Sequence, residues 1–197
     1  MTAEAPRSRP TSPRIAPLPE AEWDDRTREL LGRAGVPGGD TTNIFTTLVR
    51  HPRLFRHWLP FGGALLTGSL SARDREIVIL RTAWRCRSVY EWGQHVRLAT
   101  AAGLTPVEIE RVTGPEGSGA VGWSQLEVAI LRATDELHDD NCVGDATWQV
   151  LAEHYDDQQL VELVMLVGQY HMVAGALNSF GVRREAGVVG FPDEEGT

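Results

Sequence analysis

Three polar side chains at helical spacing are the strongest candidates for chemistry in this sequence. Ser88, Glu91 and His95 lie at positions i, i+3 and i+7 of one segment, so on a helix they would stack above one another. An apolar seam runs beside them, which places the carboxylate and the imidazole at or beside a face that should be buried. Burying such groups is costly unless they are paired. A carboxylate four residues from a histidine provides that pairing and poises a proton near neutral pH.

A second acidic residue on the preceding segment belongs to the same pattern. Glu76 is in register with Leu80 and Ala83, and it lies past the first turn, so capping does not explain it. The plain structural alternative is an ion pair of Glu76 with Arg73, with Arg75 or with a more distant arginine.

For Glu91 and His95 the structural alternative is a pair that faces solvent on the helix surface. Three acid–base groups on one helical hairpin favour a catalytic site instead. In that site His95 would be the proton donor, oriented by Glu91 or Glu76.

The elements that must position these residues are all expected to be helices. Ser71 is a suitable N-cap for one of them, and Gly103 is a suitable terminator of the next. No alternating strand pattern is present, and three similar apolar segments suggest stacked helical hairpins. The glycine-rich stretch 114–122 lacks a phosphate-loop motif and is interpreted as a linker. The expected helices span residues 21–34, 43–49, 52–66, 72–85, 88–102, 105–112, 124–138, 146–154 and 157–182.

Composition limits the possible class of protein. The chain has 197 residues, of which 42% are hydrophobic and 23% charged, enough for one folded domain. The net charge of −8 argues against nucleic acid or anionic membranes as partners. No long apolar run or secretory signal is evident, and the cysteines, Cys86 and Cys142, form no CxxC pair. We therefore expect a reduced, cytoplasmic protein.

The chain divides into three parts. Residues 1–19 hold five of the eleven prolines and are expected to form a flexible arm. Residues 20–185 carry the helical periodicity and are expected to form a single all-α domain, and residues 186–197 form a C-terminal tail.

The segment ARDREIVILRTAWRCRSVYEWGQHVRLATAAGLTPVEIERV resembles the carboxymuconolactone decarboxylase family, which is related to the alkylhydroperoxidase D-like proteins. The resemblance extends over about residues 50–113, and residues 123–183 resemble the C-terminal helices of longer members. It implies an all-α fold of helical hairpins. It also implies homo-oligomers, trimers or hexamers, with pockets near the subunit contacts.

The peroxidase branch of that superfamily carries a glutamate, eleven residues, CxxC, three residues and a histidine. Here the frame begins at Glu76, the two cysteine positions hold Ser88 and Glu91, and the histidine position holds His95. A dithiol peroxidase needs one thiolate to attack peroxide and a second thiol to resolve it. Cys86 lies two residues before the frame and has no sequence partner, so a thiol-dependent peroxidase is the least favoured alternative.

The decarboxylase branch implies an enzyme without a metal or organic cofactor. Such an enzyme must hold an anion, stabilise an enolate and deliver a proton. Arg81 and Arg85 are candidates for holding a carboxylate, although both could be solvated surface residues. Ser88 and Trp92 are further candidates for substrate contact, and Trp92 also fits helix packing.

His171 is a candidate substrate-binding residue on another apolar stripe, where a satisfied core histidine is the alternative. A metal site of Glu91, His95 and His171 has no support from spacing, so no metal is expected. The favoured function is cofactor-free acid–base chemistry on a small carboxylated lactone or related carbonyl compound. The alternative is a non-catalytic small-molecule-binding or assembly protein.

Overall fold

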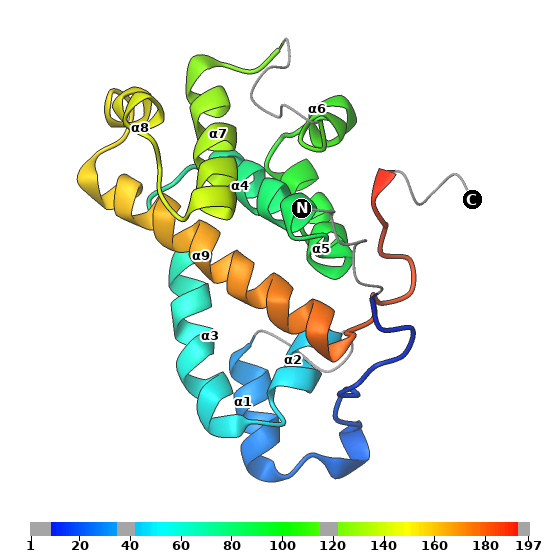
Figure 1. The fold of residues 1–197 in the computed structure, drawn as a ribbon. Helices are drawn as coiled ribbons and strands as arrows, with labels where there is room; N and C mark the ends of the chain where they lie inside the picture. Colours follow the sequence, from blue (N-terminus) through cyan, green and yellow to red (C-terminus); the bar gives the residue numbers. More distant parts are fainter. Residues whose placement is uncertain (1–8, 35–41, 115–121, 193–197) are drawn as a thin grey trace, which may run out of the picture.

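Every regular element in the part of the chain that the structure describes is helical (Figure 1). The structure is a computed structural model that describes residues 9–34, 42–114 and 122–192. The predicted all-α class is confirmed. The helices agree with the predicted ranges to within a few residues at each end. The expected linker 114–122 lies almost wholly outside the described residues. A short 3-10 helix, η1 (Glu20–Glu22), precedes α1 (Asp25–Arg33), α2 (Asn43–Leu48), α3 (Pro52–Leu66), α4 (Ala72–Arg85), α5 (Val89–Ala101), α6 (Pro106–Arg111), α7 (Gln125–Asp140), α8 (Asp145–Ala152) and α9 (Asp157–Phe180).

The hairpin of α4 and α5 is the centre of the fold. The Ser71 side chain accepts a hydrogen bond from the Asp74 backbone N–H at 3.0 Å, as expected for the predicted N-cap. After α4, Arg87 takes a left-handed conformation with φ of 51°, and the Ser88 N–H donates to the Ala83 carbonyl. This tight turn folds α5 back onto α4.

The core surrounds α4, in which every residue from position 76 to position 83 is buried. Helices α5, α7 and α9 all pack against it. Helix α9 crosses the molecule between the α4–α5–α7 group and helices α1–α3 (Figure 1). Among the described helices only α9 is long and apolar enough to span a membrane. Its contacts with α3, α4, α5, α7 and α8 are those of a core helix.

The N-terminal segment differs from the flexible arm expected for residues 1–19. From residue 9 onward it lies against the helices. The Arg14 and Ile15 N–H groups both donate to the Phe180 carbonyl, at 2.8 and 3.2 Å. The Leu18 N–H donates to the Thr46 carbonyl at 2.9 Å. Proline prevents helix formation here, but extended backbone still satisfies carbonyls exposed at the ends of α9 and α2.

The C-terminal segment also packs more closely than a tail would. The Phe191 side chain is buried against Trp84 and Trp92, with ring centroids 5.1 and 5.5 Å apart. Gly93 on α5 permits this approach, because a Cβ atom there would lie 2.4 Å from the Val189 carbonyl oxygen. The domain therefore extends beyond the expected boundaries of residues 20 and 185.

Deleting residues 1–19 should destabilise the protein. The deletion removes three backbone hydrogen bonds to the body and the packing of Leu18 in the cluster around Phe55. At about 1 kcal/mol per hydrogen bond, the melting temperature should fall by roughly 5–10 °C. Thermal unfolding followed by circular dichroism measures this, with deletion of residues 1–8 as the control. An unchanged melting temperature for the longer deletion would show that the packed segment contributes nothing.

Candidate active site

Glu76 and His95 form a buried pair that joins α4 to α5. The His95 Nδ1 atom lies 2.7 Å from Glu76 Oε2, and the Arg75 Nε–H donates to Glu76 Oε1 at 3.2 Å. Glu76 is fully buried, and His95 is 8% exposed. Because Nδ1 is engaged by the carboxylate, Nε2 is the ring nitrogen left for a substrate. Of the two glutamates considered from the sequence, Glu76 is the one that orients His95.

A cavity of about 380 Å³ adjoins this pair. That volume suits a small organic molecule. Glu91 and His95 both line it, whereas Glu76 lies behind the imidazole and does not. The Tyr170 ring meets the His95 ring edge-on, with centroids 5.0 Å apart. The wall is mostly apolar and includes Ala34, Ile44, Phe45, Trp58, Leu59, Leu66, Leu98, Val173 and Leu177.

Glu91 is an isolated carboxyl group on the cavity wall. The residue is 2% exposed, and neither carboxylate oxygen has a hydrogen-bond partner among the described residues. Burial raises the pKa of Glu91 well above its usual range, because the charged form loses its hydration. The protonated carboxylic acid is therefore favoured, and such a group donates a proton or a hydrogen bond into the cavity.

The Glu91 carboxyl should make stability depend on pH in a defined direction. The folded state keeps this proton where the unfolded state has lost it, so stability should fall as pH rises above about 4.5. Relative to Glu91→Gln, wild-type protein should lose up to about 1.4 kcal/mol per pH unit until the folded carboxyl ionises. Urea unfolding of both proteins between pH 5 and 8 measures the difference. A difference that does not change with pH would mean that Glu91 ionises normally.

A polar frame closes the cavity beside Glu91. The Glu185 carboxylate accepts hydrogen bonds from the Tyr90 hydroxyl at 2.8 Å, from the Asn43 N–H at 2.6 Å and from the Gln94 side-chain amide. The Tyr90 hydroxyl in turn accepts from the Ile44 N–H at 3.1 Å. This frame holds α2 and the C-terminal segment against α5.

Sequence reasoning did not identify Glu185, Gln169 or Tyr170 as part of the site. Glu185 lies about 90 residues from its partners on α5, and no local spacing connects them. Gln169 lines the cavity with a buried carbonyl oxygen that has no partner among the described residues. For Tyr170 the sequence offers only the apolar periodicity of α9. That periodicity places the neighbouring residue, His171, on the apolar stripe and does not single out Tyr170.

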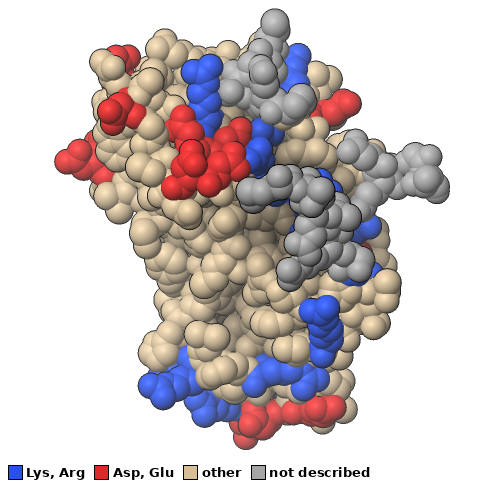
Figure 2. Space-filling model, in the orientation of Figure 1, with Lys and Arg blue, Asp and Glu red and all other residues tan. Residues whose placement is uncertain are grey.

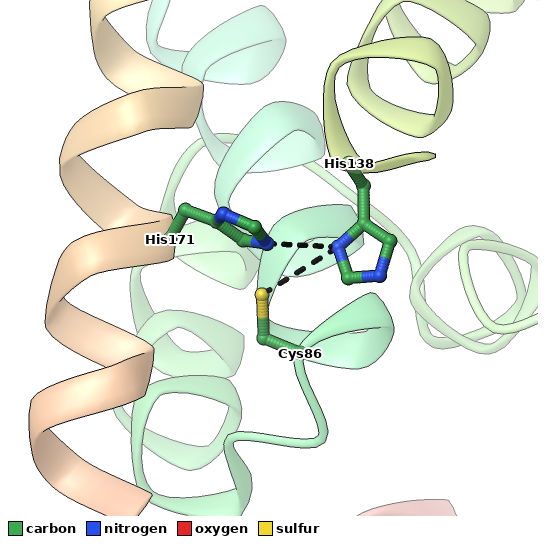
Figure 3. Close-up of side chains that lie close together, drawn as sticks. All are labelled: Cys86, His138 and His171. Carbon is green, nitrogen blue, oxygen red and sulfur yellow. Dashed lines mark hydrogen bonds between the residues drawn. The ribbon is translucent and has the colours of Figure 1, made fainter. Parts of the chain in front are cut away.

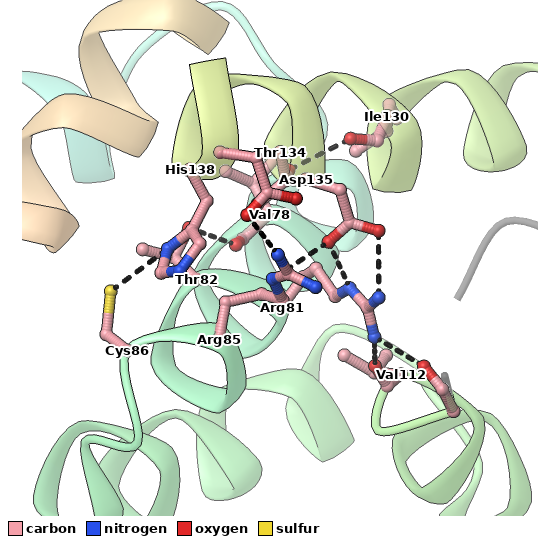
Figure 4. Close-up of polar contacts among 12 residues, drawn as sticks. Val78, Arg81, Thr82, Arg85, Cys86, Val112, Ile130, Thr134, Asp135 and His138 are labelled. Atoms are coloured by element: carbon pink, nitrogen blue, oxygen red, sulfur yellow. Dashed lines mark hydrogen bonds and ion pairs between the residues drawn. The ribbon is translucent and has the colours of Figure 1, made fainter. Parts of the chain in front are cut away.

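The two arginines expected to hold a carboxylate lie elsewhere (Figure 4). Arg81 is 1% exposed, and its guanidinium makes two hydrogen bonds to Asp135, at 2.7 and 2.8 Å. It also donates to the Val112 and Gly114 carbonyls, at 2.5 and 2.9 Å. Arg85 pairs with Asp135 and with Asp139. Neither arginine lines the cavity, so the expected carboxylate clamp is not formed there.

The other three predicted contact residues are also outside the cavity wall. Ser88 is fully buried, and its hydroxyl has no partner among the described residues. Trp92 packs in the core against Trp84. His171 lies 2.9 Å from His138, measured from Nε2 to Nδ1, so it does not join Glu91 and His95.

The thiols stand apart from the acid–base groups. Cys86 is half-buried, Cys142 is exposed, and neither lines the cavity. Burial raises the pKa of Cys86 to about 12, so its thiolate is scarce near neutral pH.

Residues 52–136, which contain Glu76, Glu91 and His95, match the model of the carboxymuconolactone decarboxylase family. Over these residues the chain is similar to the carboxymuconolactone decarboxylase family, and its fold is that of alkylhydroperoxidase D-like proteins. No curated protein matches the sequence significantly.

Solved structures show the same fold. A peroxidase-related protein from Ralstonia eutropha with an alkylhydroperoxidase core is 21% identical, with a TM-score of 0.74 over 87% of this chain and 93% of that one. A peroxidase-related protein from a Silicibacter species is 14% identical, with a TM-score of 0.72 over 95% and 97% of the two chains. An apo debrominase is 12% identical, with a TM-score of 0.71 over 87% and 92%. At these identities the likeness concerns the fold alone.

Proposed function

We propose that the protein is a cofactor-independent acid–base enzyme that decarboxylates a small carboxylated lactone. The observation that carries the proposal is the cavity itself. It places a carboxyl group that favours its protonated form, Glu91, beside an imidazole held by a buried carboxylate, the His95–Glu76 pair. The match of residues 52–136 to the carboxymuconolactone decarboxylase family supports the substrate class.

In the proposed reaction the bond between the lactone carbon and its carboxylate breaks, and CO2 leaves. The electron pair of that bond spreads into the conjugated enolate of the lactone carbonyl. One proton then adds to carbon, so that the carboxylate is replaced by hydrogen. The apolar wall favours the step, because a localised carboxylate loses more hydration there than a delocalised enolate does.

Each residue of the candidate site would have a separate role in this reaction. His95 delivers the proton through Nε2, while Glu76 acts as a positioning residue that fixes the ring through Nδ1. Glu91 donates a hydrogen bond to the enolate oxygen or to the departing carboxylate. Among the described residues of the cavity wall, the arginine is Arg33, whose side chain also pairs with Glu29.

A screen for released CO2 tests the function. Purified full-length protein is incubated with carboxymuconolactone and with related carboxylated γ-lactones, and headspace CO2 and the remaining lactone are measured. The proposal expects CO2 and lactone loss in equal amounts, above a heat-denatured control. Binding of these compounds without turnover would instead favour the non-catalytic binding protein. Reduction of an organic hydroperoxide by a dithiol would favour the peroxidase.

We further propose that the protein is a homo-oligomer, a trimer or hexamer, in the cytoplasm. On the left and centre of the face in Figure 2, a surface without charged side chains lies between the charged upper and lower ends of the molecule. Exposed apolar residues on α9, Val161, Met165 and Met172, support burial against a second copy. Light scattering coupled to size exclusion measures the subunit number, and a monomer would contradict the proposed assembly.

The proposed cytoplasmic location is supported by the two free cysteines, which suit a reducing compartment.

A further inference from the structure

A second cluster of reactive side chains lies outside the candidate active site. Cys86 at the end of α4, His138 on α7 and His171 on α9 point toward one another (Figure 3). The Cys86 Sγ atom lies 3.8 Å from His138 Nδ1, and His171 Nε2 lies 2.9 Å from the same nitrogen. All three potential ligand atoms lie within 4.8 Å of one another.

These separations are close to those of a tetrahedral zinc site. With Zn–N bonds of about 2.0–2.1 Å and Zn–S bonds of about 2.3 Å, tetrahedral angles place two nitrogens about 3.3 Å apart and nitrogen and sulfur about 3.5 Å apart. The cluster needs only small side-chain movements to reach these values. One thiolate and two imidazoles form a ligand set that favours Zn²⁺ over Mg²⁺ or Ca²⁺.

We propose that Cys86, His138 and His171 bind one Zn²⁺ ion with a fourth position open to water or a small ligand. The ion would join the C-terminal ends of α4 and α7 to the middle of α9, three core helices that are far apart in sequence. On binding, the Cys86 thiol gives its proton to solvent, and the hydrogen bond between the two imidazoles is replaced by two Zn–N bonds.

The surroundings of the cluster support a preformed site. The Cys86 carbonyl accepts hydrogen bonds from the Asn178 side-chain amide and from the Arg9 guanidinium, both at 3.0 Å, which fix the backbone that carries the thiol. Arg9 and Arg85 are both nearby cations, and the charge of Arg85 is balanced by the Asp135 and Asp139 carboxylates. The positive charge beside the site is therefore partly compensated.

A second cavity lies beside His171. A cavity of about 380 Å³ is lined by His171 together with Leu137, Asn141, Val164, Met165 and Met172. This cavity is separate from the one that contains Glu91 and His95, with only Gln169 common to both walls. Of the three proposed ligands His171 lines this cavity, so the cavity approaches the cluster from the His171 side.

Zinc titration of chelator-treated, full-length protein tests the proposal. Competition with a chromophoric zinc chelator should show one Zn²⁺ per chain. Co²⁺ in its place should give tetrahedral d–d bands and a thiolate charge-transfer band. Cys86→Ser, His138→Gln and His171→Gln should each weaken Zn²⁺ binding at least about 10²-fold. At a hundredfold excess over Kd, Zn²⁺ should raise the melting temperature of wild-type protein on the order of 5–10 °C.

Matched controls separate this site from adventitious binding. Cys142→Ser removes the exposed cysteine, and His154→Gln removes an exposed histidine on the α8–α9 connection; both should keep wild-type affinity. The proposal is overturned if wild-type protein binds no stoichiometric Zn²⁺, or if any of the three ligand variants binds it as tightly as wild type. Circular dichroism of each metal-free variant establishes that it is folded, and the cobalt spectrum of a folded Cys86→Ser variant should lack the thiolate band.

Discussion

Replacing His95 with alanine should lower the turnover of a carboxylated lactone by a factor on the order of 10²–10⁴, the contribution of a positioned acid–base group. The variant removes the imidazole that lines the cavity and leaves the fully buried Glu76 carboxylate without it. Steady-state kinetics of wild-type and variant protein measure the loss in kcat. Because Glu91 lies on the same cavity wall, Glu91→Gln should cost a similar factor.

The double variant gives the sharper result. If His95 and Glu91 form one proton-transfer unit, the combined loss should be far smaller than the product of the two single losses. His154→Ala is the matched control, because this histidine is exposed and hydrogen-bonds only locally, to the Val150 carbonyl. Fully multiplicative losses would show that the two residues act independently.

Glu76 should behave differently, because it acts through His95. Glu76→Gln should lower kcat and move the pH profile of kcat, while leaving KM close to that of wild type. A purely structural role would leave the pH profile unchanged.

Replacing Arg81 with alanine should reduce the free energy of unfolding by about 3–5 kcal/mol, the usual cost of removing one partner from a buried ion pair. The variant leaves Asp135 and the Val112 and Gly114 carbonyls without the guanidinium that now satisfies them (Figure 4). Chemical denaturation measures the loss, and Arg81→Lys should recover only part of it because lysine lacks the forked geometry.

An exposed arginine provides the control for Arg81. Arg28 pairs with Glu20 at 3.6 Å, with its side chain 50% exposed, and Arg28→Ala should cost at most about 1 kcal/mol. If Arg81→Ala remained as stable as the control while losing affinity for lactones, the original prediction of Arg81 as a substrate ligand would be restored.

The helices and the central pair were accessible from sequence because their signals are local. Capping residues such as Ser71 and the helical spacing of polar groups predict α4 and α5. Because the turn between these helices is short, they pack side by side and bring Glu76 into contact with His95. Glu76 and His95 are 19 positions apart in the sequence, and one hairpin therefore brings them together.

The rest of the site depends on contacts that no local pattern specifies. Glu185 reaches Tyr90 across 95 positions, and Arg81 reaches Asp135 across 54. From sequence, Arg81 on a helix is equally compatible with solvent, with substrate and with a buried carboxylate. The packing of α7 against α4 decides among these three environments, because it brings Asp135 to the Arg81 guanidinium. The same holds for Cys86, which has no cysteine partner in the sequence but two histidine neighbours in space.

The packed terminal segments show a second limit of prediction from the sequence. Proline content predicts that residues 9–18 are not helical, and they are not. It does not predict that extended backbone will bond to the Phe180 and Thr46 carbonyls, because those acceptors become available only when α9 and α2 end where they do.

The most direct test of an acid–base site is the fate of the proton. With an active lactone in D2O, wild-type protein should release one CO2 and place one deuterium, in a single stereochemical configuration, on the product carbon. Mass spectrometry and proton NMR of the product measure this. With His95→Ala the residual product should form slowly and carry deuterium in both configurations. Stereospecific deuteration at the wild-type rate by His95→Ala would contradict the assignment of His95 as the proton donor.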